Sequence, residues 1–316
     1  MLEVRNLKTH FFTRHGVVKA ADGISFRVAA GENLGLVGES GCGKSVTVLS
    51  ILRLVPEPGR ILDGEILFQG EDLLKKSEAE MRKIRGSKVS IILQDPLTSL
   101  NPAYTIGDQV GEAVRIHQHL RGKSVLRKVV EVLKLVRVPG AEVRIWDYPH
   151  QMSGGMRQRV SGAIGLSCQP KLLIADEPTT SLDVSIQAQY LDLLKQIQEQ
   201  SGISMVFVTH DFGIVARMCD QVAVMYAGKI VEIGEVREIF DHPLHPYTTA
   251  LLRCLPRLDA KSELVTIEGE PPDLSRLPPG CSFSPRCNSR KPVCDKHYPH
   301  ELRINDQHKV SCWLKG

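Results

Sequence analysis

The sequence contains no apolar run long enough to cross a bilayer, and its charges nearly cancel. A membrane-spanning helix needs about 20 apolar residues in succession, and no window of the 316-residue chain approaches that length. The formal net charge is only +4, without a strong block of Lys or Arg, so nothing points to a nucleic acid as partner. The first residues, 1–5, lack the basic and apolar regions of a signal peptide. We therefore expect a cytosolic chain.

Cysteines are sparse over most of the chain and crowded at its end. Four of them stand singly, namely Cys42, Cys168, Cys219 and Cys254, and four lie beyond residue 280, namely Cys281, Cys287, Cys294 and Cys312. A reducing cytosol disfavours disulfides, so a late cluster of this kind favours ligation of a metal or an iron–sulfur cluster.

A glycine-rich stretch follows the apolar run 34–37 and opens into a helical pattern. It consists of Gly38, Glu39, Ser40, Gly41, Cys42, Gly43, Lys44, Ser45 and Val46. Glycines let successive N–H groups point at a phosphate, and the helix N-terminus adds further N–H groups and a positive dipole end. Lys44 supplies charge to the outer phosphates, and the Ser45 hydroxyl is a ligand for Mg²⁺. The stretch predicts a nucleoside triphosphate site. Its positive environment favours a lower pKa for the Cys42 thiol, but a residue at this position is more often simply a small one, and we assign Cys42 no role.

The remaining pattern predicts an α/β fold with a helical insertion. Residues 1–33 are typical of short strands and turns, and 107–167 carry apolar residues at helical spacing only. Strands and helices alternate again from residue 172, which indicates a largely parallel sheet covered by helices. From residue 241 the chain is rich in proline and poor in apolar runs, so we expect a small irregular appendix with little core.

An apolar strand over residues 171–175 ends in two acids, Asp176 and Glu177. Asp176 is expected in the Mg²⁺ shell. Glu177 is expected to polarise the attacking water, because phosphoryl transfer needs a positioned nucleophile. Such a strand is common by itself but becomes a strong signal downstream of a phosphate loop.

Four further motifs occur between and around these two. They are Gln94 after a strand, Ser153-Gly154-Gly155-Met156 opening a helix, Asp183 in the stretch 181–183, and His210 at a strand end. In this order and spacing the motifs closely resemble the nucleotide-binding subunit of an ABC transporter, over residues 1 to about 240. The resemblance implies a P-loop NTPase cassette, with antiparallel strands in its N-terminal part, a mostly parallel sheet with helices, and a helical subdomain at about 97–167.

The resemblance also implies a mechanism with two cassettes arranged head to tail. Ser153, Gly154, Gly155 and Met156 would then serve the ATP of the partner cassette, and Asp183 would cross the dimer interface. Gln94 would link the Mg²⁺ and water site to the helical subdomain, and His210 would contact the γ-phosphate. Adenine normally stacks on an aromatic residue before the phosphate loop; spacing places His15 there, with Phe12 close by, whereas the family usually has Tyr or Trp.

The segment 241–316 is similar to the extension of oligopeptide and dipeptide transporter ATPases. His242 and His245 alternate with prolines in its His-Pro-Tyr stretch, and we interpret them as shaping a turn before a helix rather than binding metal. The later cysteines, Cys281, Cys287, Cys294 and Cys312, resemble that family's cysteine motif, which implies a [4Fe–4S] cluster. Structural zinc, whose cysteine pairs are usually closer in sequence, is the second interpretation, and free thiols are the third.

The resemblance also implies partners for the chain. Met156 stands where the family consensus has Gln, a form that is frequent in peptide-transporter ATPases paired with a second, distinct ATPase, so a heterodimer is expected. Two membrane permease subunits and an extracytoplasmic peptide-binding protein would complete the assembly, with this chain on the cytoplasmic face of the membrane.

Three functions are compatible with these motifs. The first is hydrolysis of ATP to drive import of di- or oligopeptides, and the second is the same role for nickel or another small solute. The third, a soluble ABC ATPase in DNA repair or translation, usually has two cassettes or long coiled coils; this chain has one cassette and no sustained heptads. The four-cysteine region favours peptides.

Overall fold

The computed structural model describes residues 1–95, 99–180, 182–255, 266–305 and 307–315. The chain forms two compact units: the first comprises Met1–Val28, Asn33–Leu74 and Val208–Gly316, and the second Ala29–Glu32 and Lys75–Phe207. The boundary expected between residues 240 and 241 falls inside the first unit. The predicted helical subdomain, apart from residues 97 and 98, which lie outside the described ranges, falls inside the second.

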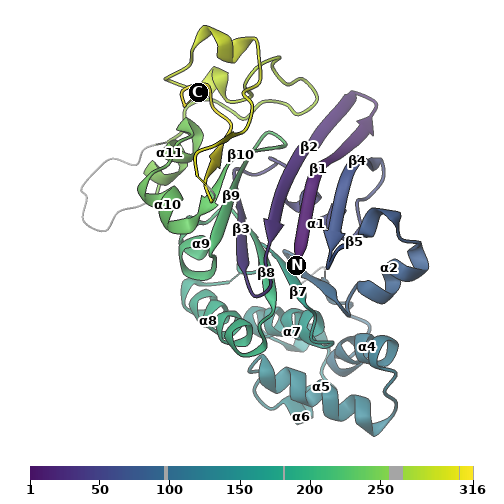
Figure 1. Ribbon diagram of the computed structural model, residues 1–316. Helices are drawn as coiled ribbons and strands as arrows, with labels where there is room; N and C mark the ends of the chain where they lie inside the picture. The colour runs from purple at the N-terminus through teal and green to yellow at the C-terminus, as the bar shows by residue number, and fades with distance from the viewer. Residues whose placement is uncertain (96–98, 181, 256–265, 306, 316) are drawn as a thin grey trace. The chain divides into compact units, whose positions relative to one another are not determined.

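An antiparallel sheet forms the N-terminal part of the first unit, as the sequence predicts. Its strand order is β2-β1-β4-β5, with β1 (Leu2–Thr13), β2 (Gly16–Val28), β4 (Gly59–Phe68) and β5 (Glu71–Asp72). Leu2 of β1 lies opposite Val28 on one side and Phe68 on the other, and Figure 1 shows the long strands side by side. Successive side chains of a strand point to opposite faces of the sheet. In β2, Phe26 is therefore buried, whereas its neighbours Ser25 and Arg27 are exposed.

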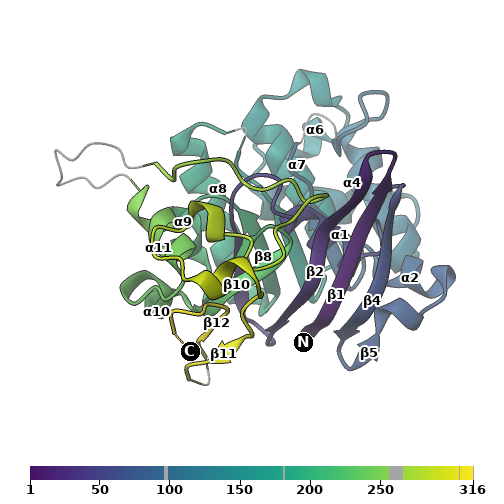
Figure 2. The same ribbon diagram turned by 90° about the horizontal axis from the view of Figure 1, so that it is seen from above.

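The second sheet of this unit is mixed, with strand order β11-β12-β10-β9-β3. Its strands are β3 (Asn33–Val37), β9 (Gln221–Tyr226), β10 (Lys229–Glu235), β11 (Leu302–Arg303) and β12 (Lys309–Val310). β3 and β9 are parallel, and β10 pairs with β9 in the antiparallel sense. The C-terminal extension adds two more antiparallel strands, β12 beside β10 and β11 beside β12 (Figure 2). The helices are α1 (Lys44–Ile51), α9 (Phe212–Met218), α10 (Val236–Asp241) and α11 (Pro246–Arg253), with 3₁₀ turns at Leu73–Lys75, Ser284–Arg286 and Pro292–Asp295.

The C-terminal extension shares the hydrophobic core of the first unit. Tyr247 and Phe283 are 0% and 3% exposed, and they belong to the same buried cluster as Val37, Phe212 and Tyr226. The sequence predicts an appendix with little core because its apolar residues are scattered. The structure shows that these scattered residues pack against strands and helices of the cassette instead of forming a core of their own.

The second unit contains three strands of the eight-stranded sheet and most of the described helices. The strands follow the order β8-β7-β6, and β6 and β7 are parallel. Their bounds are Val89–Ile92 for β6, Leu172–Asp176 for β7 and Ser204–Thr209 for β8. The last two residues of β8 belong to the first unit. The helices are α2 (Glu78–Ile84), α4 (Ile106–Gln118), α5 (Lys123–Leu135), α6 (Ala141–Arg144), α7 (Gly154–Leu166) and α8 (Val184–Ser201), with a 3₁₀ turn at Pro149–Gln151.

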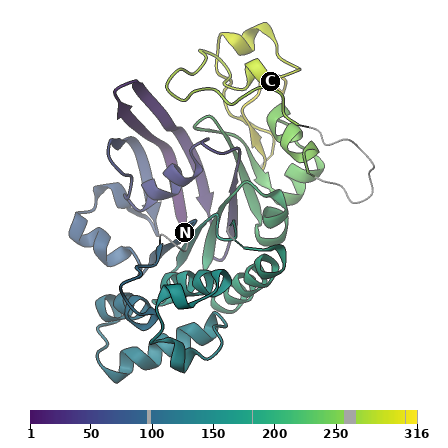
Figure 3. The same ribbon diagram turned by 180° about the vertical axis from the view of Figure 1, so that it is seen from behind.

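Local sequence signals set the ends of several helices. Ser77 caps α2 in a capping box with Glu80, and α8 begins after the side-chain cap Asp183 and ends at Gly202, whose φ of 65° stops the helix. The helices α4, α5 and α7 pack on one another and are seen in teal in Figure 3. In the described ranges, none of the helices has the length and apolar character required to cross a membrane.

Candidate functional site

The glycine-rich stretch joins the buried strand β3 to α1, as predicted. The helix begins at Lys44 after Gly43, whose φ is 105°. A Cβ at Gly43 would lie 1.8 Å from the carbonyl oxygen of Ala20, and one at Gly38 would lie 2.2 Å from that of Met225. Side chains at these two positions are therefore excluded by backbone, because the loop is pressed directly against neighbouring strands.

Lys44 lies at the centre of this loop. Its side chain is buried, with the residue only 5% exposed, and Nζ donates to the carbonyl oxygens of Gly38 at 2.7 Å and Glu39 at 3.0 Å. The loop thus holds a positive charge among its own carbonyl groups, next to the N-terminus of α1. This arrangement is suited to a phosphate, which would accept hydrogen bonds from the ammonium and from the helix N-terminus.

Cys42 does not have the lowered pKa that its position suggests. Burial raises the pKa of the Cys42 thiol, and this effect outweighs the opposing charge of Lys44. The residue is 5% exposed. The sequence shows the nearby lysine, which favours a lower pKa, but it does not show the loss of water around the sulfur, which raises the pKa.

The two acids follow β7 in the second unit. Asp176, the last residue of the strand, is 5% exposed, and Glu177 has a φ of +44°. The Glu177 carboxylate accepts hydrogen bonds from Gln94 Nε2 at 2.9 Å and from Thr180 Oγ1 at 3.0 Å. A left-handed backbone at a non-glycine residue costs about 1–3 kcal/mol and is concentrated at active sites. The structure therefore brings Gln94 and Glu177 together, as candidates for one water-binding group.

The serine–glycine motif forms the start of α7. Ser153 is exposed, and its side chain caps the helix by accepting from the backbone N–H of Met156 at 3.4 Å. The open N-terminus of α7 includes Gly154 and Gly155. A Cβ at Gly155 would lie 2.9 Å from a methyl group of Ile186 in α8. The neighbouring helix therefore explains why a small residue is required at this position.

Comparisons with known proteins agree with these motifs. A family model described as "ABC transporter" matches residues 21–180, and one described as "Oligopeptide/dipeptide transporter, C-terminal region" matches residues 231–294. The dipeptide transport ATP-binding protein DppD of Bacillus subtilis is 51% identical, over 100% of this chain and 95% of its own length. The oligopeptide transport ATP-binding protein OppD of the same species is 47% identical, over 99% of this chain and 88% of its own.

The chain belongs to the ATP-binding subunits of this ABC transporter family. Its fold is that of a solved cassette, MJ0796, in a dimeric post-hydrolysis state bound to ADP and Pi, with a TM-score of 0.68 and 26% identity over 75% of this chain and 99% of that one. Membership makes this chain an ABC ATPase. The predicted fold class is confirmed.

Three predicted residues of this ATPase lie at exposed positions. His210 follows β8, Asp183 caps α8 by accepting from the Ile186 N–H at 3.0 Å, and His15 occupies the turn between β1 and β2. Phe12 is 43% exposed, and the Arg60 guanidinium lies over its ring. The roles expected of these residues stay predictions.

The His-Pro-Tyr segment of the ATPase forms a helix cap. His245 Nδ1 accepts a hydrogen bond from the backbone N–H of Tyr247 at 3.1 Å, at the start of α11. Burial lowers the pKa of His245 to about 3, so the ring is neutral and can accept. His245 therefore caps α11, whereas His242 follows the end of α10.

The four late cysteines of the ATPase meet at one place. They line a small cavity of about 20 Å³, together with His245, Phe283, Trp313 and other residues. Burial raises the pKa of Cys281 to about 11, with a further contribution from the other three thiols. Within the described ranges, however, the side chains of His, Cys, Asp and Glu form no group of three or more that is arranged to hold a metal ion.

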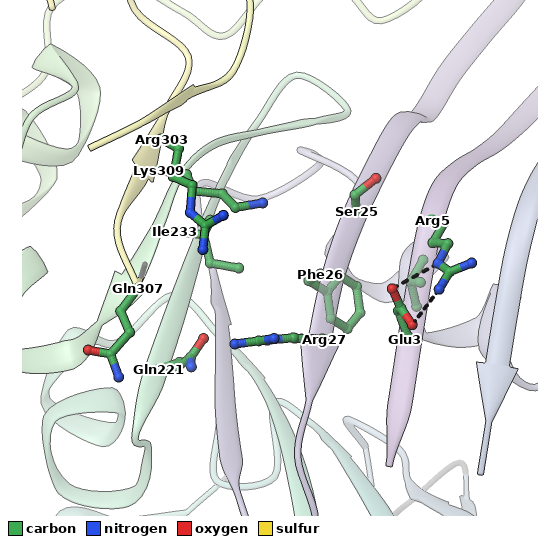
Figure 4. A pocket seen from close by; sticks show the side chains of 11 residues that line it. Glu3, Arg5, Ser25, Phe26, Arg27, Gln221, Ile233, Arg303, Gln307 and Lys309 are labelled. Carbon is green, nitrogen blue, oxygen red and sulfur yellow. Dashed lines mark hydrogen bonds and ion pairs between the residues drawn. The ribbon is translucent and has the colours of Figure 1, made fainter. Parts of the chain in front are cut away.

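A separate hollow of about 300 Å³ lies between the N-terminal sheet and the ribbon of the extension (Figure 4). Basic and amide side chains line it, among them Arg27, Gln221, Arg303, Gln307 and Lys309. Arg5 is already paired with Glu3 at 2.8 Å, as the dashed lines show. None of the residues predicted for ATP binding lines this hollow, so its size does not identify it as the nucleotide site.

Proposed function

We propose that this ATPase drives the uptake of di- or oligopeptides across the cytoplasmic membrane. The observation that carries the proposal is the match of residues 231–294 to the C-terminal region of oligopeptide and dipeptide transporters. Two relatives that align along nearly the whole chain are named for dipeptide and oligopeptide transport.

The described contacts support specific roles for the predicted residues. The loop Gly38–Val46 would hold the phosphates, with Lys44 as the counter-charge, and Mg²⁺ would be bound through Ser45, Gln94 and Asp176. Glu177 would orient and polarise the attacking water with Gln94 at its side, since the two are hydrogen-bonded at 2.9 Å. His210 would contact the γ-phosphate.

The start of α7 would serve the ATP of a second cassette. It presents the exposed cap Ser153 together with Gly154, Gly155 and Met156, and backbone N–H groups at a helix N-terminus suit a γ-phosphate. Asp183, exposed at the start of α8, would lie at the cassette interface. We propose a heterodimer with a second ATPase, two membrane permease subunits and an extracytoplasmic peptide-binding protein, placed at the cytoplasmic face of the membrane.

We also propose that the late cysteines hold a [4Fe–4S] cluster, with zinc as the alternative. The support is the donor chemistry: four thiols line one cavity, and thiolates are the ligands of such clusters. Anaerobically purified protein would be analysed for iron, sulfide and zinc. About four irons and four sulfides per chain support the cluster, and one zinc per chain supports a structural zinc site. Protein that contains neither iron nor zinc would contradict both assignments.

Uptake by intact cells tests the transported solute. A strain lacking this gene would be complemented with the natural chain or with Glu177→Gln, and import of labelled dipeptides, oligopeptides and Ni²⁺ would be measured. We expect peptide uptake to return with the natural chain only. Recovery of Ni²⁺ uptake without peptide uptake would replace the proposal by the small-solute alternative, and co-purification with ribosomes or nucleic acid would contradict both.

A further inference from the structure

Two residues of the C-terminal extension hold one residue of the phosphate loop, Glu39. The guanidinium of Arg286 donates to both carboxylate oxygens, with Nη1–Oε2 at 2.7 Å and Nη2–Oε1 at 3.0 Å. The hydroxyl oxygen of Tyr247 accepts a hydrogen bond from the backbone N–H of Glu39 at 2.9 Å. Both the side chain and the backbone of this loop residue are therefore fixed by the extension.

The pair between Arg286 and Glu39 is shielded from water. The side chain of Arg286 is 5% exposed and that of Glu39 is 25% exposed. A two-pronged guanidinium–carboxylate contact fixes the relative orientation of its partners as well as their distance. Loss of either partner would leave a charge that is largely buried and unpaired, which is far more costly than the loss of a surface ion pair.

Packed aromatic rings keep the two extension residues in place. The ring of Phe283 lies 5.3 Å from those of both Tyr226 and Tyr247, measured between centroids. Arg286 lies over the rings of Tyr226 and Phe283, at 5.8 and 5.9 Å. Its Nε also donates to the carbonyl oxygen of Glu268 at 3.0 Å. Because the arginine has packed neighbours on several sides, it cannot follow Glu39 if the loop moves.

The contact reaches the lysine that faces the phosphates. Lys44 Nζ donates to the carbonyl oxygen of the same Glu39 at 3.0 Å. Hydrogen bonds therefore run from the extension through Glu39 to Lys44. The extension also borders the loop elsewhere, because Pro271, Pro272 and Leu274 line a cavity of about 130 Å³ together with loop residues 39–42.

We propose that Arg286 and Tyr247 are positioning residues for nucleotide binding, which hold the phosphate loop in its binding form through Glu39. The proposal uses only the ATPase activity of the family and is independent of the transported solute. Arg286 also ends the 3₁₀ turn Ser284–Arg286, between two residues of the cysteine cavity, Cys281 and Cys287. The cysteine region is thus the part of the extension that presents the arginine to the loop.

Equilibrium binding of MgADP to the purified full-length chain tests the proposal, because ADP is not consumed during the measurement. Arg286→Gln should weaken MgADP binding at least about tenfold. Arg286→Lys keeps the charge without the two-pronged contact, so its affinity for MgADP should lie between those of Arg286→Gln and the natural chain. Tyr247→Phe should weaken binding less, since it removes one neutral acceptor. Arg290→Gln is the matched control, because Arg290 is an exposed arginine of the same region.

A double-mutant cycle separates positioning from general stability. Glu39→Gln should also weaken binding, and the double variant Glu39→Gln/Arg286→Gln should be little worse than either single variant, because the two residues act through one contact. In steady-state hydrolysis the KM for ATP should rise more than kcat falls. Folded Arg286→Gln protein with the MgADP affinity of the natural chain would overturn the proposal, and so would additive effects of Glu39→Gln and Arg286→Gln.

Discussion

Gln94 and Glu177 are 83 residues apart in sequence and share a hydrogen bond of 2.9 Å, in which the amide Nε2 donates to Oε2. Each follows a strand, Gln94 after β6 and Glu177 after β7, and these strands are parallel neighbours. Because the carboxyl ends of parallel neighbours lie at the same edge of a sheet, the two side chains meet there. The amide fixes one carboxylate oxygen and leaves the other oxygen to other contacts.

Replacement of Glu177 by Gln should remove hydrolysis while preserving nucleotide binding. The change keeps the size of the side chain but removes the carboxylate that would polarise water, and a general base contributes about 10²–10⁴-fold to rate. Steady-state phosphate release should fall by about that factor. Glu199→Gln, at an exposed position late in α8, is the matched control. Normal turnover of the Glu177→Gln variant would show that another group activates the water.

Substitution of the two loop glycines Gly41 and Gly43 by alanine should have very different effects. Both have positive φ, 78° and 105°, but a Cβ at Gly41 meets nothing within 4 Å, whereas one at Gly43 would lie 1.8 Å from the Ala20 carbonyl oxygen. Gly41→Ala should therefore cost only the backbone strain, about 1–2 kcal/mol. Gly43→Ala should displace the loop and largely abolish MgADP binding. Thermal unfolding and calorimetric titration measure the two effects, and equal losses would contradict this steric reason.

Sequence spacing predicted the elements around the site closely, because loop, strand and helix signals are local. The helix α1 follows the phosphate loop, and β7, α8, β8 and α9 alternate from residue 172, as the local patterns indicate. The contact between Arg286 and Glu39 joins residues 247 positions apart, and no periodicity or motif indicates it. The burial of Tyr247 and Phe283 in the cassette core was missed for the same reason: it depends on tertiary packing.

Removal of the Lys44 amine should weaken nucleotide binding rather than catalysis alone. Lys44 is 5% exposed and is held by the carbonyl oxygens of Gly38 and Glu39, so its charge is already placed before nucleotide arrives. A hydrogen bond to a charged group is worth about 1.5–3 kcal/mol, or about 10- to 100-fold in affinity. Lys44→Ala should raise the MgADP dissociation constant by this factor. Lys83→Ala, at an exposed lysine of α2, should leave it unchanged, and an unaltered constant in Lys44→Ala would refute the assignment.

Cys42 should react slowly with alkylating reagents in spite of the lysine beside it. The thiolate is the reactive form, and burial raises the pKa of Cys42 above its ordinary value of 9.0. Cys42 is also buried whereas Cys254 is half-buried, so iodoacetamide should reach and label Cys254 before Cys42, as followed by peptide mass spectrometry of the nucleotide-free protein. The labelling rate of Cys42 should still be rising at pH 9, because the thiol is then mostly protonated. A rate that levels off below pH 8 would mean that the charge of Lys44 outweighs burial, and that the phosphate loop opens to water more than the structure shows.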